Sequence, residues 1–208
     1  MGTPSVPTAA AGDSAVKRAL DLLVGGAALA LSTPFWIAIG TAITLEDGWP
    51  ILYSQRRVGK GGRIFTVYKF RSMVKDAEKR TGAVLATKDD PRITQVGRLL
   101  RKMALDEIPQ LVSIFKGDMS WVGPRPERPE FVRELIRTIP RYNERHSVRP
   151  GLTGVAQVHG RYHTDPAEKL EYDLYYVAHR SLLMDFRLFV RSWLITFKAK
   201  WDATTEPR

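Results

Sequence analysis

The sequence contains no cysteine, which excludes a disulfide framework, a thiolate metal site and a cysteine nucleophile. It also contains no Gly-x-x-x-x-Gly-Lys phosphate loop, no Gly-x-Gly-x-x-Gly dinucleotide motif and no Asp-x-Asp pair. Any chemistry on a phosphate group must therefore use a different arrangement of side chains, in which a metal ion would rest on few protein ligands.

Negative charge is scarce, because 22 Asp and Glu face 32 Lys and Arg, giving a formal net charge of +10 over 208 residues. An excess of this size predicts an anionic partner: nucleic acid, a phosphorylated substrate or anionic lipid. The apolar share of 44% argues against global disorder. The length allows one large domain or two small ones, and no linker divides the chain.

One uncharged run of 24 residues, 22–45, is long enough to span a bilayer as a helix. Pro34 lies near its middle, after Ser32 and Thr33, and a central proline removes a backbone hydrogen bond. Lys and Arg lie on both sides of the run, so the positive-inside rule places both ends in the cytoplasm. From the residues alone, a helix broken at Ser32–Pro34 that returns to its own face and a kinked spanning helix are both allowed. Residues 1–16, rich in small residues, are predicted to form a mobile tail.

A second amphipathic segment covers residues 180–201 near the other end of the chain. Its helical wheel separates an apolar face from a basic one, which fits either a helix lying in the membrane interface or a helix packing on the core. The apolar face holds Leu182, Phe186, Phe189, Trp193 and Phe197, and the basic face holds Arg180, Arg187, Arg191 and Lys198.

The rest of the chain predicts a single mainly helical α/β domain docked on a membrane. Two short strands, 50–55 and 63–70, are expected around a Gly59-Lys60-Gly61-Gly62 turn. Residues 151–158 are predicted to be extended. Helices are expected at 72–80, 96–103, 106–115, 130–139 and 166–178.

The chemistry is predicted to centre on Asp106 and Glu107, which precede Pro109. Proline is tolerated only in the first turn of a helix, so the pair is expected at a helix N-terminus, where the dipole lowers carboxylate pKa values. An ionised aspartate can act as a nucleophile, and a neighbouring carboxylate can hold Mg²⁺ together with substrate phosphates. Simple capping of the helix by the two acids is the alternative.

Cations surround this pair in the sequence. Residues 56–71 contain six cations and residues 92–102 contain four, and neither stretch has an acid. Arginines also stand beside rigid Pro and Gly residues, an arrangement that suits binding of phosphate oxygens. A diphosphate substrate needs several such groups and a metal ion to spread the charge of its transition state. Three such arginines that follow the acidic pair are Arg125, Arg149 and Arg161.

The order of these motifs resembles the bacterial sugar transferases of the monotopic phosphoglycosyl transferase family, over residues 17 to 200. The matching stretches are Lys17-Arg18 with Asp21, Ser32-Thr33-Pro34, 55–59, 68–73, 89–94 with 97–98, 101–111, 116–120 leading into 122–126, 149–154 with 156–158, and Asp173 with 175–177. The resemblance implies transfer of a sugar-1-phosphate from a UDP-sugar to a polyprenol phosphate such as undecaprenyl phosphate, with release of UMP. This reaction is the first membrane step of surface glycan assembly.

The resemblance also implies the roles of individual residues. Asp106 would be the nucleophile that forms a covalent phosphosugar ester, and Glu107 would bind Mg²⁺. Three cations match family positions that support the active site and the phosphate: Lys69, Arg101 and Arg161. Arg125 and Arg149 lie in family motifs and are expected to bind substrate phosphate.

The implied architecture has three parts: the tail, a re-entrant helix-break-helix at 17–46, and a catalytic domain at 47–208 with interfacial C-terminal helices. The protein is therefore expected on the cytoplasmic face of the inner membrane, bound to membrane lipid and not to nucleic acid; a homo-oligomer is permitted. Some relatives carry an added N-terminal multi-span region, so the chain is expected to be a minimal form or a truncation.

Two other readings remain open. A membrane-tethered basic module that binds nucleic acid or anionic lipid explains the charge, but it leaves an acidic pair among arginines without a role. A transferase that uses direct displacement, without a covalent enzyme intermediate, needs the same pocket.

Overall fold

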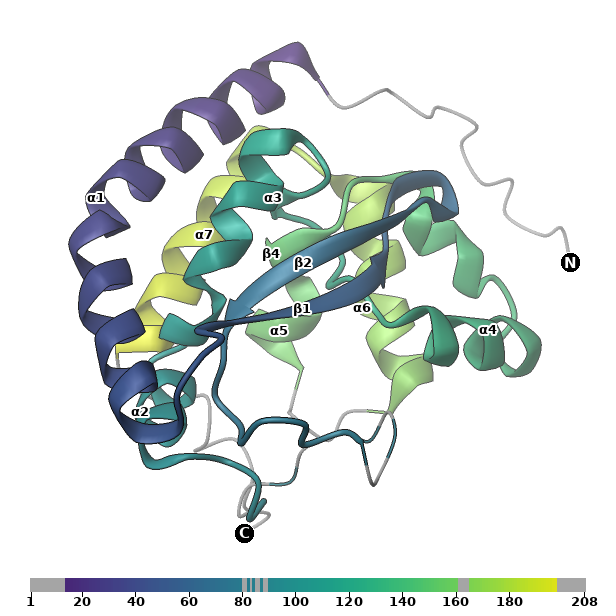
Figure 1. Cartoon of the computed structure of the whole chain (residues 1–208). Helices are drawn as coiled ribbons and strands as arrows, with labels where there is room; N and C mark the ends of the chain where they lie inside the picture. The colour runs from purple at the N-terminus through teal and green to yellow at the C-terminus, as the bar shows by residue number, and fades with distance from the viewer. Residues whose placement is uncertain are drawn as a thin grey trace, which may run out of the picture.

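A long helix, α1 (Ala15–Asp47), runs along one side of the molecule, and the rest of the fold lies on its inner side (Figure 1). The computed structural model describes residues 14–79, 82, 84, 87, 90–160 and 165–197, with only the backbone of Phe197. Helices dominate this part of the chain, accompanied by two two-stranded sheets. The prediction of a mainly helical α/β fold is confirmed.

Helix α1 is continuous through Pro34, so the predicted break at Ser32–Pro34 is wrong and a curved helix takes its place (Figure 1). A proline removes a single ladder bond, which bends a helix without ending it. The hydroxyl groups of Ser32 and Thr33 donate to the Leu29 carbonyl, at 2.9 Å and 3.4 Å, and so supply local hydrogen bonds at the bend.

The first turns of α1 are tied to the rest of the fold by three charged residues. The Lys17 ammonium donates to Asp185 Oδ2 at 2.6 Å, and the Arg18 guanidinium donates to the carbonyls of Ile114 and Phe115 at 2.7 Å and 2.8 Å. The buried Asp21 accepts hydrogen bonds from Ser120 Oγ and from the Trp121 amide. The apolar helix is therefore attached to the domain at its N-terminal end by specific polar contacts.

Replacing Arg18 with glutamine should lower the free energy of unfolding by about 1.5–3 kcal/mol, the usual value of hydrogen bonds to a charged group. The loss arises because two carbonyls at the end of α3 (Leu111–Lys116) lose their cationic donor. Thermal unfolding in detergent measures it, with Arg137→Gln on an exposed position of α4 (Pro129–Thr138) as the control. Equal melting temperatures for the two variants would show that Arg18 does not anchor the helix.

The hairpin of β1 (Leu52–Val58) and β2 (Ile64–Phe70) confirms the two predicted strands and their turn, which forms the short helix η1 (Lys60–Gly62). Strand β1 extends three residues beyond its predicted end because it pairs with β2 along its full length, from Leu52 opposite Phe70 to Val58 opposite Ile64. Phe65, Val67 and Lys69 are every second residue of β2, so their side chains lie on the same face of the strand. The first two are buried against α3, which directs Lys69 toward the turn before that helix.

The middle of the chain is more irregular than predicted. Residues 75–79 form turns instead of a helix, with Asp76 at a positive φ of 60°. The predicted helix 106–115 divides into the 3-10 helix η2 (Leu105–Gln110), which contains Pro109, and α3. The predicted extended segment 151–158 is β4 (Gly151–Thr153) followed by the helix α5 (Val155–His159).

The remaining helices agree with the sequence. The predictions at 96–103, 130–139 and 166–178 are confirmed as α2 (Gln95–Lys102), α4 and α6 (Pro166–His179). The 3-10 helix η3 (Tyr142–Ser147) lies between α4 and β4, and α7 (Leu182–Phe197) follows α6.

A parallel pair of strands, β3 (Ser120–Val122) and β4, brings the Gly-Pro-Arg-Pro and Arg-Pro-Gly motifs side by side. A Cβ atom on Gly151 would lie 2.1 Å from the backbone nitrogen of Gly123, so only glycine allows this approach. The glycines of both motifs therefore serve backbone packing that sets the positions of the neighbouring arginines.

Helix α7 packs with one face and exposes the other. Leu188 is buried, and Phe189 makes an edge contact with Trp121 at 5.2 Å between ring centroids. Leu183, Phe186 and Leu194 are all more than half exposed. The helix therefore combines core packing with an uncovered apolar face, and Lys198 lies outside the described residues.

Candidate active site

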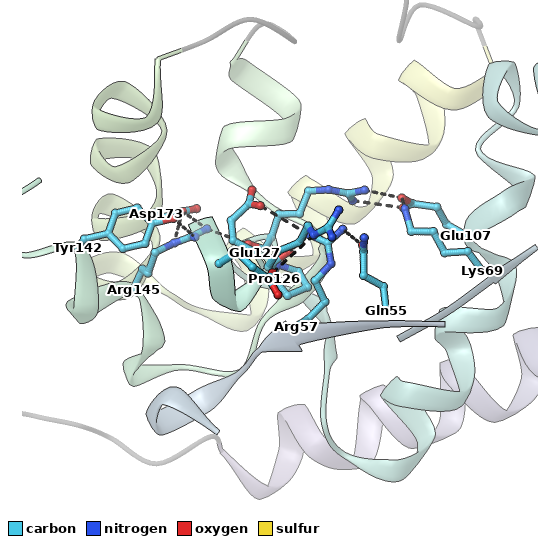
Figure 2. Close-up of polar contacts among 12 residues, drawn as sticks. Gln55, Arg57, Lys69, Glu107, Pro126, Glu127, Tyr142, Arg145 and Asp173 are labelled. Carbon is cyan, nitrogen blue, oxygen red and sulfur yellow. Dashed lines mark hydrogen bonds and ion pairs between the residues drawn. The ribbon is translucent and has the colours of Figure 1, made fainter. Parts of the chain in front are cut away.

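Glu107 lies at the centre of an ion-pair cluster that joins η2 to β2 and to the Gly-Pro-Arg-Pro segment. The Lys69 ammonium donates to Glu107 Oε1 at 2.7 Å, and the Arg125 guanidinium contacts both carboxylate oxygens, at 3.2 Å to Oε2. Figure 2 shows a row of polar contacts, which we call the polar chain, with Lys69 and Glu107 in contact at one end. Burial opposes ionisation of Glu107, but Arg125 and Lys69 outweigh it and hold its pKa well below the ordinary value.

Asp106 is placed differently, although it is the next residue in the chain. It is only 8% exposed, and it makes no hydrogen bond or ion pair with any described residue. Burial raises the pKa of Asp106, and the neighbouring Glu107 adds to this rise, while Lys69 and Arg101 oppose it. The prediction that both carboxylate pKa values are lowered is therefore wrong for Asp106, because burial outweighs the neighbouring cations.

The other predicted site residues divide into two groups. Arg125 contacts Glu107 directly, and Arg101 at the end of α2 acts on Asp106 through its charge. Arg149 stands before Pro150 at the start of β4, and in the described part of the chain no hydrogen bond or ion pair links it to either carboxylate. Arg161 lies outside the described residues.

A cavity beside the cluster contains two residues that the sequence interpretation missed, Arg57 and Gln110. It is lined by Arg57, Val67, Lys69, Gln110, Arg125 and Pro126. The amide nitrogen of Gln110 is buried and donates to no acceptor within the described residues. Arg57 belongs to the basic run at 56–71, and Gln110 follows Asp106 by four residues, so charge and helical spacing were the signals that could have identified them.

The cavity has an excess of positive charge. Three cations line it, and two of them, Lys69 and Arg125, are paired with Glu107. Arg57 also contacts the backbone, donating to the Pro126 carbonyl at 2.8 Å, and lies 3.6 Å from Glu127. Cationic side chains beside a carboxylate are typical of enzyme sites that transfer phosphoryl groups.

Comparison with known proteins identifies the family. The model of the bacterial sugar transferase family matches residues 12–199, and the chain belongs to that family. The resemblance inferred from the sequence is confirmed.

Relatives with known names share this region. The chain is 42% identical over 191 residues to a UDP-N-acetylgalactosamine-undecaprenyl-phosphate N-acetylgalactosaminephosphotransferase of Aeromonas hydrophila, covering 89% of this chain and 45% of that protein. It is 40% identical over 187 residues to the exopolysaccharide production protein PSS of Rhizobium leguminosarum bv. phaseoli, covering 85% of this chain and 92% of that protein. It is 38% identical over 187 residues to a UDP-glucose:undecaprenyl-phosphate glucose-1-phosphate transferase of Klebsiella pneumoniae, covering 88% of this chain and 39% of that protein. The chain thus spans less than half of the Aeromonas and Klebsiella relatives and nearly all of the Rhizobium one.

Proposed function

We propose that the protein transfers a sugar-1-phosphate from a UDP-sugar to a polyprenol phosphate, such as undecaprenyl phosphate, and releases UMP. The reaction passes through a covalent ester between Asp106 and the phosphosugar. Relatives named as undecaprenyl-phosphate sugar phosphotransferases support this reaction class. Their names include N-acetylgalactosamine, glucose and galactose, so the identity of the donor sugar has to be measured.

The observation that carries the proposal is the different environment of the two adjacent carboxylates. Glu107 is fixed by two cations, whereas Asp106 is buried beside the same cations and has no hydrogen-bond partner in the described structure. A nucleophile needs an oxygen lone pair that is available for attack, whereas a carboxylate that balances charge can have both oxygens bound by cations. Asp106 therefore attacks, and Glu107 orients Lys69 and Arg125.

The chemistry divides into two displacements at one phosphorus. An Asp106 oxygen attacks the sugar-bearing phosphorus, the phosphoanhydride bond breaks, and UMP leaves with the bridging oxygen. A phosphate oxygen of the polyprenol phosphate then attacks the same phosphorus, and the aspartate leaves as a carboxylate. Lys69, Arg57 and Arg125 offset the charge that develops on the phosphoryl oxygens in both steps.

The residues also suit Mg²⁺. No group of three or more metal-ligating side chains occurs in the described residues, so Glu107 would hold the ion, and substrate phosphates and water would complete its shell. This donor set fits Mg²⁺, which commonly binds through one or two carboxylates and substrate phosphates. When bound, the ion would neutralise phosphate charge.

The membrane arrangement follows from where the two ends of α1 attach. Arg18 holds the N-terminal end to α3, while the Arg71 guanidinium donates to the Asp47 carbonyl at 2.8 Å at the C-terminal end. Because one folded domain binds both ends, these ends lie on one side of the bilayer, and the unbroken, curved α1 is embedded in a single leaflet without crossing to the other. The positive-inside rule makes this the cytoplasmic leaflet.

The exposed apolar surface of α1 and α7 completes the membrane contact. Leu31 is 76% exposed and Phe186 is 64% exposed, although both are large apolar side chains. Patches of this kind mark membrane or protein contacts. We assign α7 to the membrane interface, where the exposed Phe186 and Trp193 face lipid and its arginines face the headgroups.

A panel of UDP-sugars with undecaprenyl phosphate in detergent or nanodiscs tests the function. UMP release that requires both the sugar nucleotide and the lipid phosphate over many turnovers is the expected result. Binding of polyanions without UMP release from any donor would instead identify a basic membrane module.

The pH profile of UMP release should show an acid limb above the ordinary aspartate pKa of about 3.9. Burial raises the pKa of Asp106, and attack requires its ionised form, so activity falls as pH decreases through this raised value. The measurement is the single-turnover rate without polyprenol phosphate, because that lipid titrates in the same range. An acid limb at the ordinary aspartate value would contradict a buried nucleophile.

A further inference from the structure

Arg145 of η3 joins three elements through one buried guanidinium. Its Nε donates to Asp173 Oδ2 at 2.9 Å, its Nη1 donates to the Tyr142 hydroxyl at 2.7 Å, and its Nη2 donates to the Arg125 carbonyl at 2.8 Å. Asp173 belongs to α6, far from the carboxylate pair in the sequence. Figure 2 shows Asp173, Arg145 and Tyr142 at the opposite end of the polar chain from Glu107 and Lys69.

The pair is almost completely removed from water, with 6% of the Arg145 side chain and 3% of the Asp173 side chain exposed. Burying two charges is costly, and a buried ion pair is often no more stable than an apolar replacement. Simple stabilisation is therefore a weak explanation for this pair. A fixed orientation of neighbouring groups is a use that such pairs can serve.

The Arg145 guanidinium is connected to the active site through its hydrogen bond with the backbone of Arg125. Arg145 binds the carbonyl of Arg125, and Arg57 binds the carbonyl of the next residue, Pro126. Prolines on both sides of Arg125 restrict the backbone further. Two guanidinium groups from different elements thus hold the short segment whose side chain contacts both oxygens of Glu107.

We propose that Arg145, held by Asp173, is a positioning residue that fixes the Arg125 backbone so that the Arg125 guanidinium lies on Glu107 and on the transferring phosphate. This inference rests on the proposed function. Arg145 itself touches neither the carboxylate pair nor the cavity beside it, and it acts through Arg125.

Arg145→Lys is the test variant, because one ammonium keeps the charge opposite Asp173 but cannot reach all three partners of the fork. Its kcat/KM for UMP release should fall by about 10- to 100-fold, the usual effect of a displacement near 1 Å at a catalytic group. Tyr142→Phe is the matched control, since it removes a hydrogen bond of similar length from the same guanidinium but not the one to Arg125. It should retain activity within about twofold.

A double-variant cycle separates positioning from general stability. In an Arg125→Ala background, Arg145→Lys should cause no further loss of activity, because the group that it positions is gone. Melting temperatures measured in parallel should fall for both variants, and further for Arg145→Lys, because lysine gives up more than one of the three hydrogen bonds. Equal activity losses for these two variants, or additive losses in the cycle, would overturn the inference, whereas absence of UMP release from the wild type would contradict the proposed function itself.

Discussion

Replacing Asp106 with asparagine should abolish turnover, lowering the rate of UMP release by about 10⁴-fold or more, as expected for loss of a nucleophile. Asparagine has nearly the same shape, but its amide cannot attack phosphorus at a useful rate. The measurement is UMP release under saturating UDP-sugar and undecaprenyl phosphate. Full activity of the variant would exclude Asp106 as the attacking group.

The same variant should fold at least as stably as the wild type. Burial disfavours the charged form of Asp106, and the side chain has no hydrogen bond with the described residues to lose. A neutral amide therefore removes a desolvation cost without breaking a contact. Melting temperature is the readout, and Glu134→Gln, an exposed carboxylate on α4, controls for removal of a negative charge elsewhere. A large fall in melting temperature would show that the activity loss reflects unfolding.

Two glutamates on the exposed face of α1, at Leu31 and Ile37, should release the protein from membranes. A charged residue at the centre of a membrane helix costs about 2.5–3.5 kcal/mol. Two such residues together shift membrane partitioning by about 10³- to 10⁵-fold. The side chains they replace are 76% and 69% exposed, so the core should remain intact.

Flotation with vesicles containing anionic lipid measures this effect. Arg137→Glu changes the net charge by the same two units on the exposed face of α4, so it controls for electrostatic repulsion from the lipid. We expect the control to float with the vesicles and the double variant to remain at the bottom of the gradient. Full flotation of the double variant would contradict membrane insertion of α1.

Local sequence patterns were sufficient for the long helices and the hairpin. The uncharged run of 24 residues predicted α1, and alternation around a glycine-rich turn predicted β1 and β2. The predicted break at Pro34 does not occur, because a single missing hydrogen bond bends a helix whose other backbone hydrogen bonds are intact. Residues 72–80 were predicted as a helix, although Asp76 adopts a left-handed conformation there.

The sequence identified the carboxylate pair but not the difference between its members. Asp106 and Glu107 are adjacent and chemically alike, so only the folded positions of Lys69 and Arg125 decide which one is neutralised. Burial, which raises the pKa of Asp106, is equally a property of the tertiary structure. Arg145 and Asp173 were missed because their contact joins residues 28 positions apart, and neither stands beside the pair in the chain.

Intact-protein mass spectrometry, after the enzyme is mixed with a UDP-sugar alone, detects the Asp106 phosphosugar ester itself. We predict a burst of up to one UMP per chain and a protein heavier by one phosphosugar, with the added mass on the peptide that contains Asp106. Addition of polyprenol phosphate should then discharge the adduct and yield the lipid-linked diphosphate sugar. A fully active enzyme that shows neither the burst nor the added mass would contradict a covalent aspartyl intermediate.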